Sequence, residues 1–262
     1  MSKNKLALSE EEKARDLNAE EIKELLIDKA ILETAKEYKF SDEEEEEFEY
    51  FFNNEKNKFF IAKAIENKIS LNENDITKIY TDNKADFDAQ NIPFSQAREI
   101  IQRDLLNQQV AALESEEVNR LIEEMEDTIE ITKKELLFSK GNPEIIKTII
   151  VGKVIEKKMN DEQFESQEEN QKTLEVIKDK VYIDYYLNLE VRKNVQVTQE
   201  EVVEIYEKEK AKLGNITPNS AYQQIADGLL NNKAIKERND LINKISEEYK
   251  IDEIVEEYAD VE

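Results

Sequence analysis

Apolar residues recur every three or four positions along most of this chain. Ile22, Leu25 and Leu26, for example, fall on one broad face when their segment is drawn as a helix. Only 4 glycines and 3 prolines interrupt the pattern in 262 residues. A chain so regular in its apolar spacing and so poor in turn-forming residues is predicted to be all-α.

Capping and breaking signals divide the pattern into helices. Asn18 and Thr198 are each followed three residues later by a glutamate, which is the capping box that opens a helix. Pro93 and Pro218 are expected at the starts of the two longest helices. Expected helices cover roughly residues 18–38, 41–52, 59–65, 72–83, 95–125, 144–159, 174–185, 198–206 and 220–249, with a break at Asn53–Asn54 and a strand-like tail at Ile251–Ile254.

Three blocks of sequence occur twice, in the same order. The matched residues are Lys29 and Lys153, Leu105 and Leu229 (each pair 124 positions apart), and Tyr80 and Tyr206 (126 positions apart). The offsets of the three blocks differ by only two residues, and this difference falls in a loop. Such agreement predicts a tandem duplication of one helical unit of roughly 125 residues. The two tyrosines are expected to pack a short helix against the long helix that follows it.

The predicted organisation is an N-terminal extension over residues 1–17, a first helical module over 18–140 and a second over 141–262. The turn Gly141-Asn142-Pro143 separates the two modules. In each module the first helices are expected to pack against the long last helix, which would give an elongated molecule. An alternative left open is the exchange of such elements between the two copies, or between two chains to form a homodimer.

The charge of the chain excludes several classes of partner. The net charge is −25, whereas binding to phosphate needs clustered lysines and arginines, so nucleic acid is not an expected partner. No apolar run approaches the roughly 18 residues of a transmembrane span, so no membrane insertion is expected. The acidic run Glu43–Glu47 is interpreted as a helix start rather than a cation site, because consecutive helical residues point in all directions.

The residue types that are missing restrict the chemistry. The chain has no histidine and no cysteine, which rules out Ser-His-Asp and Cys-His catalysis and ordinary zinc sites. We therefore expect a protein that is not an enzyme, with no catalytic, metal-binding or cofactor-binding residues. The first residues contain no secretory signal, so the protein is either cytoplasmic or begins after a removed leader.

Aromatic residues form dense clusters for so polar a chain. Two interpretations remain open: they form a client-binding surface for extended apolar peptides, or they form the helical core. The client-binding candidates are Phe48, Phe51, Phe52, Phe59, Phe60, Tyr182, Tyr185 and Tyr186.

Several segments are similar to one known family. Residues 25–44 read LLIDKAILETAKEYKFSDEE and residues 197–206 read VTQEEVVEIY. The first segment resembles the opening helix and cap of SurA-type chaperones and PrsA-type foldases, and the second resembles their Val-Thr-x-Glu-Glu block. Residues 221–251 are similar to the returning C-terminal helix of that family. The resemblance covers most of both halves and implies a doubled SurA-like chaperone module, with a periplasmic location if a leader was removed.

One departure from this family bears on activity. Its foldases usually carry a parvulin isomerase domain between the tyrosine block and the returning helix. Here only a short loop separates Tyr80 from Ser95, and Tyr206 from Ser220. Parvulin chemistry also relies on histidines, which this chain lacks. The resemblance therefore implies the chaperone module without the isomerase.

The function expected from the sequence is that of an ATP-independent chaperone, or holdase. It would bind unfolded or partly folded exported proteins in an apolar helical groove. A first alternative is a helical adaptor or assembly subunit for one folded partner protein. The weakest alternative is a peptidyl-prolyl isomerase, because it would have to work without histidine or cysteine.

Overall fold

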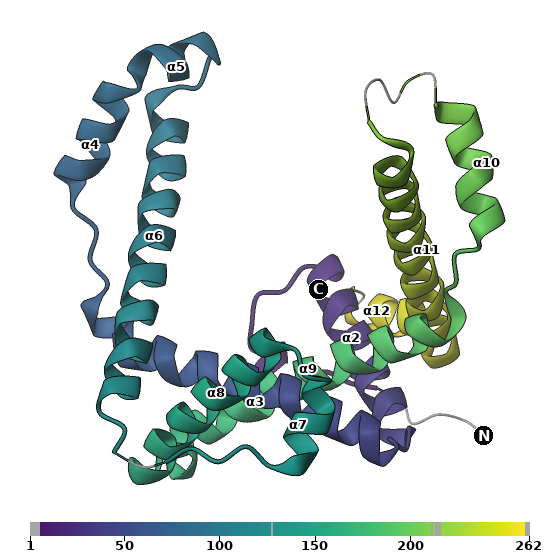
Figure 1. Ribbon diagram of the computed structural model, residues 1–262, viewed down its shortest axis with the longest axis horizontal. Helices are drawn as coiled ribbons and strands as arrows, with labels where there is room; N and C mark the ends of the chain where they lie inside the picture. Colours follow the sequence, from purple (N-terminus) through teal and green to yellow (C-terminus); the bar gives the residue numbers. More distant parts are fainter. Residues whose placement is uncertain (1–5, 127, 211, 213–215, 260–262) are drawn as a thin grey trace. The chain divides into compact units, whose positions relative to one another are not determined.

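The computed structural model describes residues 6–126, 128–210, 212 and 216–259 and consists of two compact units. Unit 1 combines residues 1–48 with residues 178–262, and unit 2 is the continuous segment 49–177. Within the described residues every regular element is a helix, which confirms the all-α prediction (Figure 1).

The helices follow one another in two similar series. The first series is α1 (Glu10–Lys13), α2 (Ala19–Glu37), α3 (Asp42–Ile65), the 3-10 turn η1 (Glu66–Lys68), α4 (Glu73–Asp82), α5 (Lys84–Ala89) and α6 (Phe94–Glu123). The second series is α7 (Lys133–Ser139), α8 (Pro143–Asp161), the 3-10 turn η2 (Phe164–Ser166), α9 (Glu168–Asn194), α10 (Gln199–Glu209), α11 (Pro218–Tyr249) and α12 (Ile251–Ala259).

The predicted helix starts agree with the structure where a capping side chain defines them. Asn18 caps α2 and Thr198 caps α10, each in a reciprocal capping box with the glutamate three residues on. Thr217 caps α11, and Pro218 is its first residue. Pro93 is itself the cap residue of α6 and makes no side-chain hydrogen bond there.

Other expectations differ from the structure. The helix α3 runs without a break through Asn53 and Asn54, because asparagine costs a helix only a fraction of 1 kcal/mol and the surrounding residues pack on both sides. The expected strand-like tail at Ile251–Ile254 is instead the start of the helix α12. Ile251 and Ile254 are three residues apart and lie on its buried face. The short helices α1, α5 and α7 were not expected from the sequence.

The core of unit 1 joins the two ends of the chain. The helix α2 packs against both α11 and α12, with Leu26 and Ile251 completely buried. The predicted N-terminal extension is part of this core, since Leu8 is only 5 % exposed. The Leu8 N–H also donates to the hydroxyl of Tyr258 at 2.9 Å. Residues 6–13 therefore belong to the folded unit and are not an appendage.

The core of unit 2 forms around α8, which packs against α6 and α7. Its buried apolar residues are Phe60, Ile61, Leu121, Val154, Ile155, Met159 and Phe164. Glu117 of α6 is also buried, at 4 % exposure, and accepts hydrogen bonds from Arg120 and Lys68. These hydrogen bonds, that of Arg120 foremost, outweigh burial and hold the pKa of Glu117 below its ordinary value.

The units differ from the predicted modules, residues 18–140 and 141–262. We expected α2 to pack on α6 and α8 on α11, within each half of the sequence. Instead α2 packs on α11 and α12, and α8 packs on α6, which is the exchange of elements between the two halves that the sequence had left open. The cause is the length of α3 and α9, each of which continues from one unit into the other.

Each unit also carries a helical hairpin of two antiparallel helices (Figure 1). In unit 2, Tyr80 of α4 lies 4.7 Å from Phe94 of α6, measured between ring centroids. In unit 1, Tyr206 of α10 lies 4.5 Å from Tyr222 of α11. The prediction that these tyrosines pack a short helix on a long one is confirmed.

Two helical glycines provide a matched test of packing. A Cβ added at Gly228 in α11 meets no atom within 4 Å, whereas a Cβ at Gly152 in α8 would lie 3.0 Å from Nδ2 of Asn57. Alanine is favoured over glycine in a helix interior, so Gly228→Ala should raise the free energy of unfolding by about 0.5–1 kcal/mol. Gly152→Ala should gain less or destabilise, because the buried Asn57 must move. Urea denaturation followed by circular dichroism measures both, and an equal gain for the two variants would contradict the close contact.

Candidate protein-binding surfaces

A recurrent polar arrangement fixes the start of the short helix α1 in unit 1. Ser9 and Glu12 form its capping box. Lys29 of α2 donates to Oε2 of Glu12 at 2.6 Å and to the backbone carbonyl of Ala7 at 3.1 Å. One lysine thus ties the capped helix and the extended segment before it to the next helix. We call this arrangement a lysine-clamped capping box.

The same arrangement fixes the start of α7 in unit 2. Thr132 and Glu135 form the capping box. Lys153 of α8 donates to Oε2 of Glu135 at 2.8 Å and to the carbonyl of Glu130 at 2.6 Å. Burial raises the pKa of Glu135, but hydrogen bonds from Lys153 and Thr132 outweigh it and hold this pKa below its ordinary value. The carboxylate of Glu135 is therefore ionised at neutral pH.

A third clamp and a related contact lie in the hairpins. In unit 1, Lys233 of α11 donates to the capping-box carboxylate of Glu201 at 2.6 Å and to the carbonyl of Gln196 at 2.8 Å. In unit 2 the N–H of Ser70, before α4, donates to Oε1 of Gln109 at 3.1 Å. The long helix thus holds the start of the short one in both hairpins.

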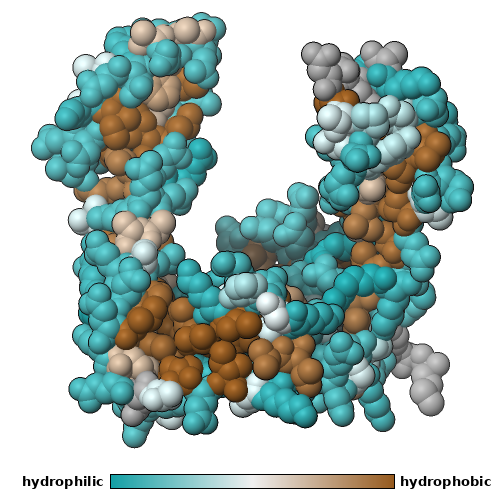
Figure 2. Space-filling model, viewed as in Figure 1, coloured by the Kyte–Doolittle hydropathy of each residue, from teal (hydrophilic) through white to brown (hydrophobic). Residues whose placement is uncertain are grey.

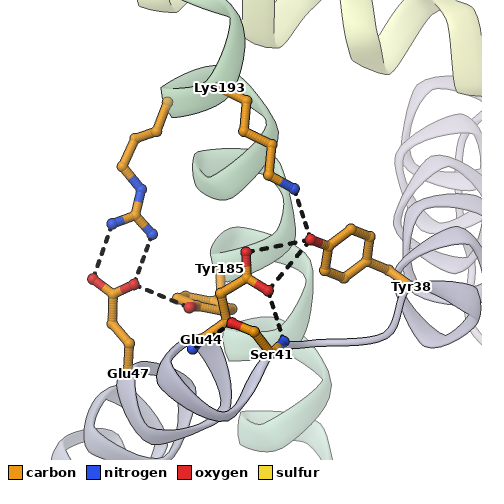
Figure 3. A network of polar contacts seen from close by, with 7 residues as sticks. Tyr38, Ser41, Glu44, Glu47, Tyr185 and Lys193 are labelled. Atoms are coloured by element: carbon orange, nitrogen blue, oxygen red, sulfur yellow. Dashed lines mark hydrogen bonds and ion pairs between the residues drawn. The ribbon is translucent and has the colours of Figure 1, made fainter.

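A second polar network closes the corner between α2 and α3 in unit 1 (Figure 3). The hydroxyl of Tyr38 lies 3.3 Å from both carboxylate oxygens of Glu44 and accepts a hydrogen bond from Nζ of Lys193 at 2.7 Å. Glu44 also accepts a hydrogen bond of 2.9 Å from the N–H of Ser41, the residue directly before α3. Lys193 lies 4.4 Å from the ring centroid of Tyr38, so a cation–π contact adds to the hydrogen bond.

The other half of this network centres on Glu47. Its two carboxylate oxygens accept a bidentate pair of hydrogen bonds from Arg192, each 2.9 Å long. The hydroxyl of Tyr185 donates to the same carboxylate at 3.0 Å. Burial, and then Glu47, raise the pKa of Tyr185 above its ordinary value, so this hydroxyl remains a neutral donor. Because these groups are engaged with one another, we assign the network to holding α3 against α9.

The structure separates the eight aromatic candidates by burial. Four of them are core residues that no client can reach in the folded protein: Phe48 (3 % exposed), Phe60 (4 %), Tyr185 (3 %) and Tyr186 (7 %). They are buried because they pack on other aromatic rings, as in the 4.9 Å contact of Phe48 with Tyr182. Tyr182, Phe52 and Phe59 are half-buried. Phe51, at 44 % exposure, is the candidate that presents the most surface.

Phe51 belongs to a larger apolar surface in unit 2. Its neighbour Tyr50 lies 4.9 Å from Phe138 of α7, between ring centroids, so α3 and α7 meet there. The helix α7 also exposes Leu136 (53 %) and Leu137 (67 %). Figure 2 shows a continuous apolar area over α3, α7 and α8. We give the name α3–α7 patch to Tyr50, Phe51 and Phe138, which are joined by ring contacts, together with Leu136 and Leu137, the exposed leucines that precede Phe138 in α7.

Sequence reasoning missed the two leucines of this patch. They lie in α7, a helix that was not predicted because it ends close to the Gly141-Asn142-Pro143 turn. The capping box formed by Thr132 and Glu135, followed directly by an apolar run, was the signal that could have identified it. The hairpin helices α10 and α11 expose further apolar side chains, namely Val203, Leu230 and Ile235, and Ile216 just before α11 is also exposed.

A cavity of about 260 Å³ lies between the end of α6 and α8, lined by Leu121, Met125 and Val154 together with charged side chains. The charged side chains are those of Glu124, Glu126, Lys157, Lys158 and Asp161. No group of acidic residues within the described ranges has an arrangement that could hold a metal ion. No helix in the described part of the chain has the length and apolar character of a membrane span.

Comparison with known proteins adds no relative. No protein-family model, curated protein or solved structure matches this chain. The similarity to SurA-type chaperones and PrsA-type foldases therefore remains a resemblance of motifs.

The clamp at α7 predicts a pH-dependent contribution to stability. Glu135→Gln should lower the free energy of unfolding by about 1 kcal/mol at pH 7, because a charge-assisted hydrogen bond is lost. A carboxylate with a lowered pKa stabilises the fold above its unfolded pKa and loses this effect as the pH falls through the folded value. The difference between variant and wild type should therefore vanish towards pH 3, as measured by urea denaturation at several pH values.

Glu156→Gln is the matched control for that experiment. Glu156 is an exposed residue of α8, and the substitution makes the same change of charge without removing a clamp. It should alter stability by less than about 0.5 kcal/mol at either pH. An equal effect of the two substitutions would mean that net charge, and not the contact with Lys153, is responsible.

Proposed function

We propose that this protein is an ATP-independent chaperone, a holdase that binds unfolded or partly folded polypeptides. Its clients bind through apolar segments on the surface of unit 2. The resemblance to SurA-type chaperones adds exported proteins as the class of client. Binding needs no nucleotide, metal or covalent step.

The observation that carries this proposal is the α3–α7 patch. It exposes Phe51, Leu136 and Leu137 at 44, 53 and 67 %, in a chain with a net charge of −25. Soluble proteins rarely expose large neighbouring apolar side chains without a binding role. Apolar side chains on helices make few directional contacts, which suits clients of unrelated sequence.

The acidic character of the chain supports the same function. Self-repulsion keeps the protein soluble, and a complex with an aggregation-prone client shares that charge. Outside residues 133–158, which carry seven lysines and three glutamates, the acidic surface of the chain also attracts client segments that carry lysine or arginine. An unfolded client loses conformational entropy when it is captured, so each contact is weak and release needs no energy source.

The first test is suppression of aggregation. Several unrelated proteins, chemically unfolded, are diluted with and without this chain in the absence of ATP, and light scattering is followed. Equimolar or smaller amounts should reduce scattering for most of them. Protection of none would refute the holdase and turn the search to one specific folded partner.

The double variant Phe51→Ser/Leu137→Ser locates the activity. Both side chains are exposed, so the free energy of unfolding should change by less than about 1 kcal/mol. Suppression should fall to less than about half of the wild-type value, because the apolar area of the patch is reduced. The same light-scattering assay measures this, with circular dichroism as a check on folding.

Ile235→Ser is the control. This residue of α11 is 53 % exposed and lies in unit 1, outside the patch. It should keep nearly full suppression. If Ile235→Ser and the double variant lose the same share, the activity does not depend on the α3–α7 patch.

A further inference from the structure

The lysine clamps place α2 and α8 in equivalent registers. Lys29 of α2 and Lys153 of α8 lie 124 positions apart in the sequence and make the same two kinds of contact. Each holds the capped helix that precedes its own helix. Residues of α2 and α8 that are 124 positions apart can therefore be compared directly.

In unit 1 the N-terminal half of α2 is covered by α12. Ile22 and Leu26 of α2 belong to one apolar cluster with Ile254 of α12, and Leu26 has no exposed surface. An ion pair between Lys23 and Asp252, 2.7 Å long, joins the two helices beside this cluster. The face of α2 is thus closed by a short acidic amphipathic helix.

In unit 2 the equivalent face of α8 is more open. Ile146 and Ile150 stand where α2 has Ile22 and Leu26. Ile146 is half-buried like Ile22, but Ile150 is also half-buried, whereas Leu26 has no exposed surface. Among the described residues the core of unit 2 takes Val154, Ile155 and Met159 from the other half of α8. The difference is greatest at Ile150, because its counterpart Leu26 is completely buried.

The charge on this face is also unpaired. Lys147 stands where α2 has Lys23, is exposed, and makes no ion pair with any carboxylate in the described part of the chain. Residues 133–158, which form α7 and most of α8, contain seven lysines and three glutamates in a chain that is otherwise strongly acidic. Figure 2 shows an apolar area over the same two helices, α7 and α8.

The chain following α6 explains why the face is open. After α11 the chain turns at Lys250 and forms α12, which returns onto α2. After α6 it continues to the clamp at α7, with Ile129 packed on the core of unit 2. This contact of Ile129 corresponds to the packing of Leu6 and Leu8 on the core of unit 1. The described residues between α6 and α7 form no helix on the face of α8.

We propose that the N-terminal half of α8, together with α7, binds a short acidic amphipathic helix of a partner protein. The partner helix carries apolar residues at positions i, i+3, i+4 and i+7 and a carboxylate at i+1. This is the pattern of Ile251, Asp252, Ile254, Val255 and Tyr258 in α12. Its apolar residues cover Ile146 and Ile150, and its carboxylate pairs with Lys147.

The occupant is another protein and not α12 of a second copy. In each chain Ile251 is completely buried and Ile254 is 5 % exposed on α2. Release of α12 would expose this surface and break the ion pair with Lys23. A partner helix that is free beforehand meets no such cost.

The test uses a fluorescein-labelled synthetic helix with the sequence of residues 250–259, stapled between the exposed positions 253 and 257. Fluorescence anisotropy with the full chain measures its dissociation constant. Binding should weaken about fivefold in Lys147→Glu and at least tenfold in Ile150→Asp. A peptide with lysine in place of Asp252 should recover most of the binding to Lys147→Glu, because the charges are exchanged.

Three controls make the result decisive. Circular dichroism melts of each variant establish that the fold is intact, and Lys147→Glu changes an exposed side chain in any case. A scrambled peptide sets the background, and binding no tighter than this background overturns the proposal. Loss of binding in Lys23→Glu, with Lys147→Glu unaffected, would place the peptide on α2 and also overturn it. None of these results depends on whether the protein suppresses aggregation.

Discussion

The packing of α2 against α11 and α12 is the interaction on which unit 1 depends. It brings together residues from both ends of the chain, and the hydrogen bond from Leu8 to Tyr258 closes the same core. No neighbouring helix in the sequence could take the place of these partners, because α3 leaves unit 1 after Phe48. The network around Tyr38 fixes the corner between α2 and the first turn of α3.

Carboxylates serve a structural purpose in this acidic chain. At α1, α7 and α10 the capping-box glutamate accepts hydrogen bonds from its own helix start and from a distant lysine. Each glutamate so placed satisfies backbone donors and anchors a second helix with one charge. The chain can therefore carry many acidic residues while several of them contribute to tertiary contacts. This reduces the cost of a net charge that would otherwise oppose compactness.

Local features of the fold could be predicted from the sequence, and long-range ones could not. Helix starts at Asn18 and Thr198 are determined by side chains within four residues, so the capping pattern identified them. The continuity of α3 through Asn53 depends on what packs along the whole helix, which no local pattern contains. The burial of Phe48 and the exposure of Phe51 likewise depend on α9 and α7. The sequence thus indicated that the candidate site would consist of apolar side chains. Of the eight aromatic candidates, however, only Phe51 is an exposed residue.

The insertion of unit 2 between the two segments of unit 1 has a consequence for synthesis of the protein. Residues 49–177 emerge from the ribosome as one continuous segment and can fold as soon as they are complete. The helix α2 emerges earlier, but its partners α11 and α12 are made only after unit 2. At a translation rate of about 5–20 residues per second, the apolar face of α2 waits roughly 10–45 seconds for the helices that cover it. The nascent chain therefore folds from the middle outwards, and α2 is buried only after unit 2 has formed.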